Sequence, residues 1–293
     1  MYDIKALYEA SSVQEAIELL TAHPEAHIIA GGSDVLIKIR EGRMAGVELV
    51  SIYGIDELRG ISMDDDGTIR IRPLTSFSHI TKDPIIQEHI NVLGEAVDMV
   101  GGPQIRNIGT IGGNTCNGVT SADSASTLHA WDAVMEITGP NGIRQMPIKD
   151  FYISAGKVAL EHNEVLTAIL IRKESYEGYK GHYIKYGMRN AMEIATTGCS
   201  VNVKLSPDKK SIEDVRIAYG VAGPVPMRVP SAEAAAKGQP VSEETIEAFS
   251  KAVLNDINPR TSWRATKEFR QHLAVELANR ALREAIRLSG GQL

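Results

Sequence analysis

The amino-acid sequence predicts an α+β fold, in which an N-terminal part of two α/β subdomains precedes a smaller part of antiparallel strands and helices. The chain has 293 residues, 43% of them apolar, which is enough for two buried cores. Early in the chain, apolar segments end at glycines and lead into segments of helical period. Later, two strands joined by a polar turn precede a long amphipathic helix. We expect domains at 1–177, with an internal split near 55–60, and at 178–293.

The first elements follow from a capping signal and from short apolar runs. Ser12, with Glu15 three residues later, marks the start of a helix whose first N–H groups they can satisfy. The sequence then predicts a strand over 27–30 that ends at a glycine pair, a second helix over 35–39 and a strand over 47–52.

Hairpins and helices alternate in the middle of the chain. An acidic turn predicts a hairpin over 58–71, and apolar residues at near-helical spacing predict helices over 75–80 and 84–100. A Gly-Pro-Asn-Gly turn predicts a second hairpin over 134–148, and the apolar run at 165–171 indicates a strand.

A Tyr- and Gly-rich segment at 178–181 marks the expected boundary between the two domains. Beyond it, we expect strands over 201–205 and 215–221, joined by a polar turn. A helix begins near Ser242, and a long amphipathic helix over 266–288 ends at two glycines.

Composition argues against several classes of function. A formal net charge of -6, with Lys and Arg scattered along the chain, offers no basic surface for nucleic acid. Cys116 and Cys199 give no disulfide framework and no ligand set for an iron–sulfur cluster or zinc, and the histidines form no metal-ligand pair. Because there is no leader-like segment and no apolar run of membrane-spanning length, we expect a soluble, unprocessed cytoplasmic protein without a metal site.

Two glycine runs carry the main functional signal. One covers Ala30–Asp34, and the other covers Asn107–Asn114 and continues as a polar segment to Asp123. Glycines permit positive φ and a close approach of backbone to ligand, which leaves N–H groups free to point at anionic oxygens. We therefore expect the two runs to close on the diphosphate of one dinucleotide. The Gly-x-Gly-x-x-Gly pattern and a Walker lysine are absent, which disfavours the Rossmann and P-loop folds.

Each of these features also has a plainer interpretation. A single glycine pair is more often a tight turn than a phosphate site. Asp123 could cap the helix that follows it as well as accept hydrogen bonds from a ligand. Lys185, Arg189 and Glu193 are surface charges by default. Cys116 has no histidine at a motif-like spacing, so we do not expect a nucleophile there.

The segments Ala30–Leu36 and Ile105–Asn114, with Asp123 further along, resemble the two FAD-binding signatures of the flavin subunits of molybdenum hydroxylases. The similarity extends over the whole length, including 185–195 and 262–270, and is greatest to the separate FAD-binding subunits of xanthine dehydrogenases. The resemblance implies an N-terminal FAD-binding domain of the PCMH/carbon monoxide dehydrogenase medium-subunit type.

What the resemblance implies can be placed on individual residues. Ala30–Val35 would wrap one side of the FAD diphosphate, and Thr110–Asn114 the other. Asn117 and Asp123 match contacts to the ribityl and flavin part, and Lys185 matches a contact to the polar edge of the ring. Where relatives stack an aromatic ring on adenine, this chain has a valine. The full set of residues placed at FAD is Ile28, Ile29, Ala30, Gly31, Gly32, Ser33, Asp34, Val35, Val100, Ile108, Thr110, Ile111, Gly112, Gly113, Asn114, Asn117, Ser121, Asp123, Leu166, Lys185 and Ile194.

The resemblance also implies a division of labour among subunits. One partner would hold two [2Fe–2S] clusters and another the molybdopterin, in a heterotrimer that itself dimerises and acts in purine metabolism. Electrons would reach FAD in this chain from the clusters and leave to NAD or another acceptor, and no side chain of this chain would be catalytic. Two alternatives stay open: a stand-alone FAD oxidoreductase with its own substrate pocket, and a scaffold subunit that retains the loops without flavin.

Overall fold

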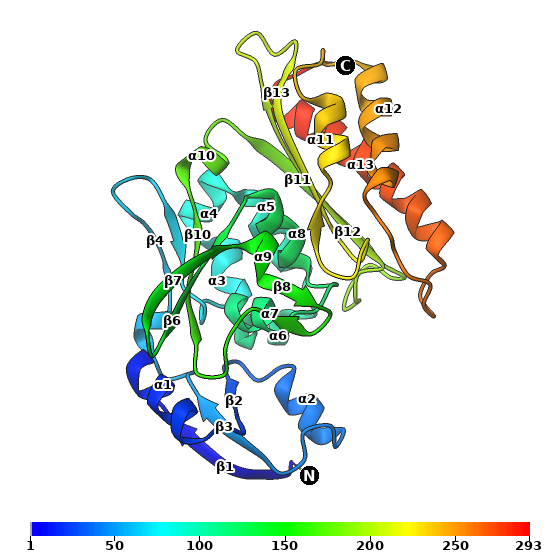
Figure 1. Ribbon diagram of the computed structural model, residues 1–293. Helices are drawn as coiled ribbons and strands as arrows, with labels where there is room; N and C mark the ends of the chain where they lie inside the picture. Colours follow the sequence, from blue (N-terminus) through cyan, green and yellow to red (C-terminus); the bar gives the residue numbers. More distant parts are fainter. Residues whose placement is uncertain (1) are drawn as a thin grey trace.

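The computed structural model describes residues 2–293, and its N-terminal lobe (residues 2–58) is a small parallel sheet with helices beside it (Figure 1). Ser12 caps the first helix as expected, because its side chain accepts from the Glu15 amide. The first strand was not predicted, since it lies at a sheet edge and is largely exposed. The strands, in spatial order, and the helices are β1 (Ile4–Glu9), β3 (Val47–Ser51), β2 (Ala26–Ile29), α1 (Val13–Ala22), α2 (Val35–Arg40) and η1 (Asp56–Leu58).

The middle of the chain forms a five-stranded antiparallel sheet against which a group of short helices packs. Both predicted hairpins are present, and Trp131 and Phe151 lie in the shared core. The strands in spatial order are β4 (Ile61–Met63), β5 (Ile69–Ile71), β10 (Val165–Ile171), β6 (Val134–Gly139) and β7 (Gly142–Pro147), with the pair β8 (Tyr152–Ser154) and β9 (Lys157–Val158) beside them. The helices are α3 (Phe77–Lys82), α4 (Pro84–His89), α5 (Asn91–Asp98), α6 (Pro103–Ile108), α7 (Ile111–Cys116), α8 (Asp123–Ala130), α9 (Ile148–Phe151) and α10 (Lys173–Tyr176).

The prediction of a single helix over 84–100 is wrong. Two helices, α4 and α5, occupy this range and meet at Ile90, whose backbone (φ -140°, ψ 44°) is not helical. Ile86, Ile90 and Leu93 are all fully buried in the same core, which the bend between the helices allows. The apolar spacing could not reveal this break, because both helices continue almost the same period.

The C-terminal part is a four-stranded antiparallel sheet with helices packed against it (Figure 1). Here α13, predicted from its amphipathic pattern, contacts both β11 and β12. The two predicted strands are present but longer than expected, because the turn between them is short and both ends continue the ladder. The elements are β11 (Lys180–Tyr186), β12 (Thr197–Leu205), β13 (Ile212–Gly220), β14 (Met227–Arg228), α11 (Pro230–Ala236), α12 (Glu243–Ala252), η2 (Val253–Asn255) and α13 (Lys267–Leu288).

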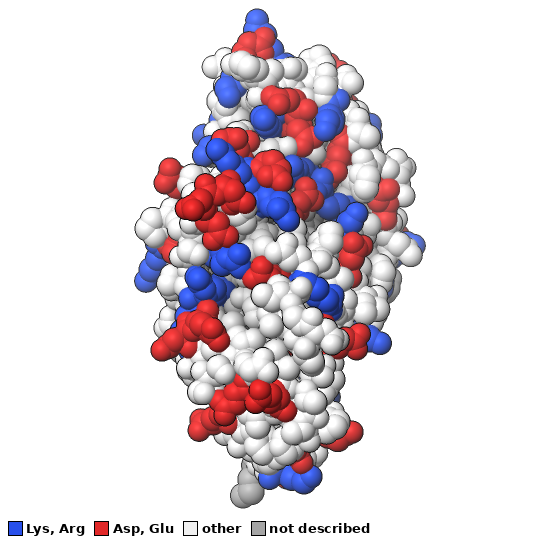
Figure 2. Space-filling view, turned by 60° about the vertical axis from the view of Figure 1, so that its left-hand side comes forward, with Lys and Arg blue, Asp and Glu red and all other residues white. Residues whose placement is uncertain are grey.

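Charges of both signs are interspersed over the face of the molecule in Figure 2. This mixture agrees with the scattered Lys and Arg of the sequence and gives that face no continuous basic field. Within residues 2–293, none of the helices combines the length and the apolar character that crossing a bilayer needs.

Replacing Gly112 should destabilise the fold. A Cβ at Gly112 would lie 2.3 Å from Cβ and 2.8 Å from Cα of Pro73, so Gly112→Ala forces α7 away from the segment before α3. We expect a loss of about 1–3 kcal/mol in the free energy of unfolding, measured by urea denaturation. Gly54→Ala is the matched control, since nothing lies within 4 Å of its added Cβ. Equal stability of the two variants would contradict the packing described here.

Burial of His129 should make stability depend on pH. Its side chain lies on α8 and is 2% exposed, and burial lowers its pKa from the usual 6.5 to about 4. Between these values the unfolded chain binds a proton that the folded chain does not, so stability falls as pH drops from about 6.5 toward 4, by up to about 1.4 kcal/mol per pH unit.

The measurement is the urea stability of wild type and His129→Gln at pH 7.5 and pH 5. We expect the variant to lose roughly 2 kcal/mol less than wild type over that interval, because glutamine does not titrate. The same pH dependence in both proteins would show that His129 makes no such contribution.

Candidate functional site

The two glycine runs line one cavity of about 720 Å³, at the junction of the N-terminal lobe and the helices α6 and α7. The loop between β2 and α2 supplies one wall, and α7 with its preceding residues supplies another. Of the residues predicted to bind FAD, those that line the cavity are Ile28, Ala30, Gly31, Gly32, Ser33, Asp34, Val35, Val100, Thr110, Gly112, Gly113, Asn114, Asn117 and Leu166.

Close backbone contact explains why Gly31 is a glycine. A Cβ at this position would lie 1.9 Å from the carbonyl oxygen of Ile108, so no side chain fits between the two runs. Gly32 does have a positive φ of 76°, as we expected of glycines in such a run. In the second run, Gly109 has a negative φ of -66°. A Cβ there would lie 2.7 Å from the Ile105 carbonyl oxygen, so close packing is what requires glycine at this position.

Free N–H groups come mainly from the first run. Within residues 2–293, the amides of 31–34 form no hydrogen bond, and they belong to a segment that lines the cavity. The second run is not an open loop, because Thr110 caps α7 and its side chain accepts from the Gly113 amide. The Gly112 and Asn114 amides also have protein acceptors, in Pro73 and Thr110. The structure therefore supplies anion-binding donors from one side of the cavity more than from the other.

Asp123 takes part in a buried ion pair. Its Oδ2 accepts from Lys185 Nζ at 2.8 Å and its Oδ1 from the Tyr183 hydroxyl at 2.7 Å, while Lys185 Nζ also donates to the Met99 carbonyl oxygen at 2.9 Å. The side chains of Asp123 and Lys185 are only 7% and 9% exposed. Burial raises the pKa of Asp123, and the Lys185 ammonium acts against that rise.

Two of the plainer interpretations are wrong for this ion pair. Asp123 does not cap α8, because it is the first residue of that helix and Ala122 holds the cap position without a side-chain bond. Lys185 is not a surface charge, because β11 brings it beneath α8. Arg189 remains largely exposed, and its Nε lies 3.3 Å from Oε2 of Glu193.

Some residues predicted to bind FAD lie outside the cavity lining. Ile111 is fully buried in the core, and Ile108 contributes its carbonyl oxygen to the contact with Gly31. Ile194 is 51% exposed, on the segment between β11 and β12. Those that do not line the cavity are Ile29, Ile108, Ile111, Ser121, Asp123, Lys185 and Ile194.

The structure adds cavity residues that sequence analysis missed. Lys38 on α2 donates from Nζ to Asn117 Oδ1 at 2.8 Å, and both residues line the cavity. His162 also lines it, and its Nε2 lies 2.9 Å from the Leu20 carbonyl oxygen. Lys38 follows Asp34 by one helical turn, a spacing that could have drawn attention to it. Cys116 lines the cavity too, but burial raises its thiol pKa to about 12, which keeps the thiol protonated.

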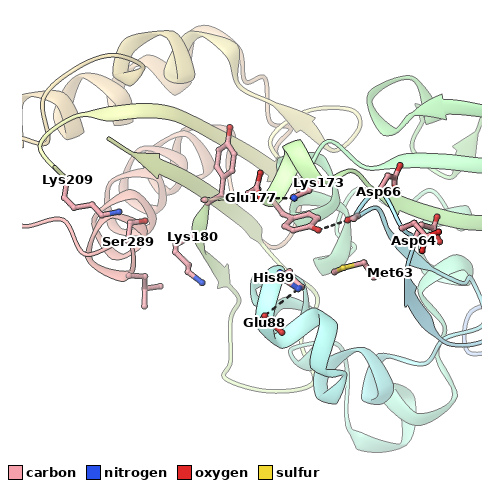
Figure 3. A pocket seen from close by; sticks show the side chains of 16 residues that line it. Met63, Asp64, Asp66, Glu88, His89, Lys173, Glu177, Lys180, Lys209 and Ser289 are labelled. Carbon is pink, nitrogen blue, oxygen red and sulfur yellow. Dashed lines mark hydrogen bonds and ion pairs between the residues drawn. The ribbon is translucent and has the colours of Figure 1, made fainter. Parts of the chain in front are cut away.

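A second hollow of about 700 Å³ lies on another part of the molecule, between the β4–β5 turn, α10 and the start of β11 (Figure 3). Among its charged side chains, Lys173 and Glu177 form an ion pair at 3.2 Å. It contains none of the predicted FAD residues.

Two family models match the chain. One, the FAD binding domain in molybdopterin dehydrogenase, matches residues 2–172. The other, the CO dehydrogenase flavoprotein C-terminal domain, matches residues 182–285.

Relatives and solved structures agree with these matches. The putative xanthine dehydrogenase FAD-binding subunit of Escherichia coli is 42% identical over 293 residues, which is 100% of both chains. The nicotinate dehydrogenase FAD-subunit of Eubacterium barkeri is 31% identical and covers 85% of this chain and 84% of its own. A carbon monoxide dehydrogenase structure from Hydrogenophaga pseudoflava superimposes with a TM-score of 0.92 at 29% identity, covering 97% of this chain and 98% of that one.

The expected α+β fold class, with an FAD-binding domain and a C-terminal domain of antiparallel strands, is confirmed by these comparisons. The resemblance seen in the sequence is confirmed as well, since the similarity covers the full length and not the glycine runs alone. The chain therefore belongs to the FAD-binding medium subunits of the molybdenum hydroxylases, a family of oxidoreductase flavoproteins.

Proposed function

We propose that this chain is the electron-output subunit of a xanthine-dehydrogenase-like molybdenum hydroxylase, and that the cavity between the two glycine runs holds FAD. Bound FAD would supply chemistry that no amino-acid side chain has, because it accepts electrons singly and gives up two together as a hydride to NAD or another acceptor. The work of the chain itself is to bind the cofactor, orient it and set its electrostatic surroundings.

One observation carries the assignment of the cavity. Four consecutive amides, at 31–34, line it without any protein acceptor among the described residues, and the Gly31 contact with Ile108 brings the second run against them. Gly31, Gly32 and Ser33 are half-buried and Asp34 is exposed, so their N–H groups are open to a ligand, and one with anionic oxygens suits a row of such donors. The diphosphate of FAD has such oxygens, and the cavity volume of about 720 Å³ lies in the range of cofactor sites.

The chain has too few cysteines to hold iron–sulfur clusters of its own, so electrons would have to come from clusters in another subunit. The two cysteines cannot supply the four thiolates that a [2Fe–2S] cluster commonly requires. By the resemblance to the family, we propose a partner with two [2Fe–2S] clusters and another with molybdopterin, in a cytoplasmic complex that acts on purines and dimerises. Relatives named as subunits or medium chains of xanthine and carbon monoxide dehydrogenases support this assembly.

We also propose the domain limits 1–177 and 178–293, with the first domain divided near 55–60. The gap between the two family matches, from residue 172 to residue 182, supports the main boundary. The change from the parallel sheet to the five-stranded sheet after η1 supports the internal division.

The cofactor assignment is tested by the flavin content of the complex purified from native extract. We expect FAD to be released on denaturation, and Gly31→Ala to retain less than about a tenth of it, because the added Cβ collides with the Ile108 carbonyl oxygen. Gly54→Ala should keep its full content. A wild-type complex that releases no FAD on denaturation would favour the scaffold alternative. Turnover of an organic substrate by the isolated chain would favour the stand-alone oxidoreductase. A separate measurement addresses the acceptor: reduction of the bound flavin by NADH in the complex would support NAD.

The Asp123–Lys185 pair should tune the midpoint potential of bound flavin. A positive charge near the ring favours its reduced, anionic form, but the charge of Lys185 is offset by Asp123 at 2.8 Å. We expect Lys185→Met to lower the potential and Asp123→Asn to raise it, each by roughly 20–40 mV, since about 1.4 kcal/mol corresponds to about 30 mV for a two-electron couple.

The double variant Lys185→Met/Asp123→Asn controls for charge, because it removes both members of the pair and should lie near the wild-type potential. Thermal unfolding of all three variants shows whether each is folded, since leaving one buried charge alone is destabilising. Unchanged potentials in both folded single variants would remove this role from the pair.

A further inference from the structure

Lys38 bridges two separate parts of the cavity wall. It lies on α2, directly after the first glycine run, and its Nζ donates to Oδ1 of Asn117 at the end of α7 at 2.8 Å. Both residues line the cavity, and Lys38 is half-buried. The ammonium is therefore held at the cavity by a neutral amide oxygen.

The charge of Lys38 is not neutralised by the protein. Among residues 2–293, no carboxylate oxygen lies within 4 Å of its Nζ. Arg43, the other Lys or Arg side chain of the lining, pairs with Glu41. The lining also includes the acidic residues Asp34, Glu161 and Glu164, the last of which pairs with Arg144. A dianionic diphosphate entering this cavity thus meets acidic groups, and Lys38 is the cation available to offset them.

Helix geometry directs Lys38 toward the free amides. Its own amide donates to the Asp34 carbonyl oxygen at 3.1 Å, so Lys38 stands one turn after Asp34. Side chains on a helix tilt toward its N-terminus, which here is the end that carries the unbonded amides of 31–34. Lys38 and the row of N–H donors therefore lie on adjoining segments of one cavity lining, a combination suited to a phosphate group.

We propose that Lys38 is the cationic residue that binds the diphosphate of FAD, and that Asn117 positions its ammonium for that contact. This inference rests on the proposed function, because it takes FAD as the occupant of the cavity. It adds a residue that lies outside the two glycine runs and that the sequence signature does not contain. Lys38 acts by charge, so its contribution weakens as salt screens it.

The experiment measures the affinity of the full-length protein, stripped of flavin, for three probes. FAD and ADP carry the diphosphate, and riboflavin does not. We expect Lys38→Met to weaken the binding of FAD and ADP roughly ten-fold or more and to leave the binding of riboflavin unchanged, since only FAD and ADP carry the diphosphate that the ammonium would contact. Lys38→Arg should restore most of the affinity. The matched control is Arg40→Met, which removes an exposed cation from the same helix outside the cavity lining.

Salt dependence separates direct contact from a merely structural bridge. Asn117→Ala breaks the Lys38–Asn117 bond but keeps the ammonium, so we expect its affinity for ADP to fall with rising salt as in wild type. Lys38→Met should show a shallower salt dependence. The role of Lys38 is overturned if Lys38→Met binds FAD and ADP as tightly as Arg40→Met does. It is also overturned if Lys38→Met loses as much affinity for riboflavin as it loses for FAD and ADP. If wild type binds neither FAD nor ADP, the proposed function itself is overturned.

Discussion

The structure depends on one backbone contact, in which the Ile108 carbonyl oxygen occupies the space that a side chain at residue 31 would need. This contact joins the N-terminal lobe to the helices of the second part, and it places the two glycine runs on one cavity. Its energy as a single contact is small. Its importance is geometric, because a cavity between two lobes has a fixed width only if the lobes are held at a fixed distance.

The two runs contribute in different ways. The amides of the first run form no hydrogen bond within the described residues, and this run leads into the helix that carries Lys38. The amides of the second run donate to acceptors at the start of α7 and to the Pro73 carbonyl oxygen. Its glycines are needed for packing: Gly112 lies against Pro73 and Gly109 against the Ile105 carbonyl oxygen. One run is therefore a source of donors, and the other is a closely packed wall against which a ligand can be held.

Burial of Asp123 and Lys185 links α8 to β11, and hence the second part of the chain to the C-terminal sheet. Removing both charges from water costs desolvation free energy. The attraction within a buried ion pair offsets that cost only with good geometry and further hydrogen bonds. Tyr183 and the Met99 carbonyl oxygen supply those bonds. Because Met99 precedes Val100, which lines the cavity, this polar cluster is connected to the cavity wall through the backbone.

The sequence by itself determined many of the local elements, the two glycine runs and the family. Capping at Ser12, the two hairpins and the amphipathic helix α13 depend on residues near one another in the chain, so pattern and capping rules sufficed. Tertiary structure alone decided the break at Ile90, the burial of Lys185, the distinct roles of the two runs and the position of Lys38 beside Asn117. Each of these depends on a partner far along the chain or on a shared core, and burial and hydrogen bonding between distant segments are set only when the chain is folded.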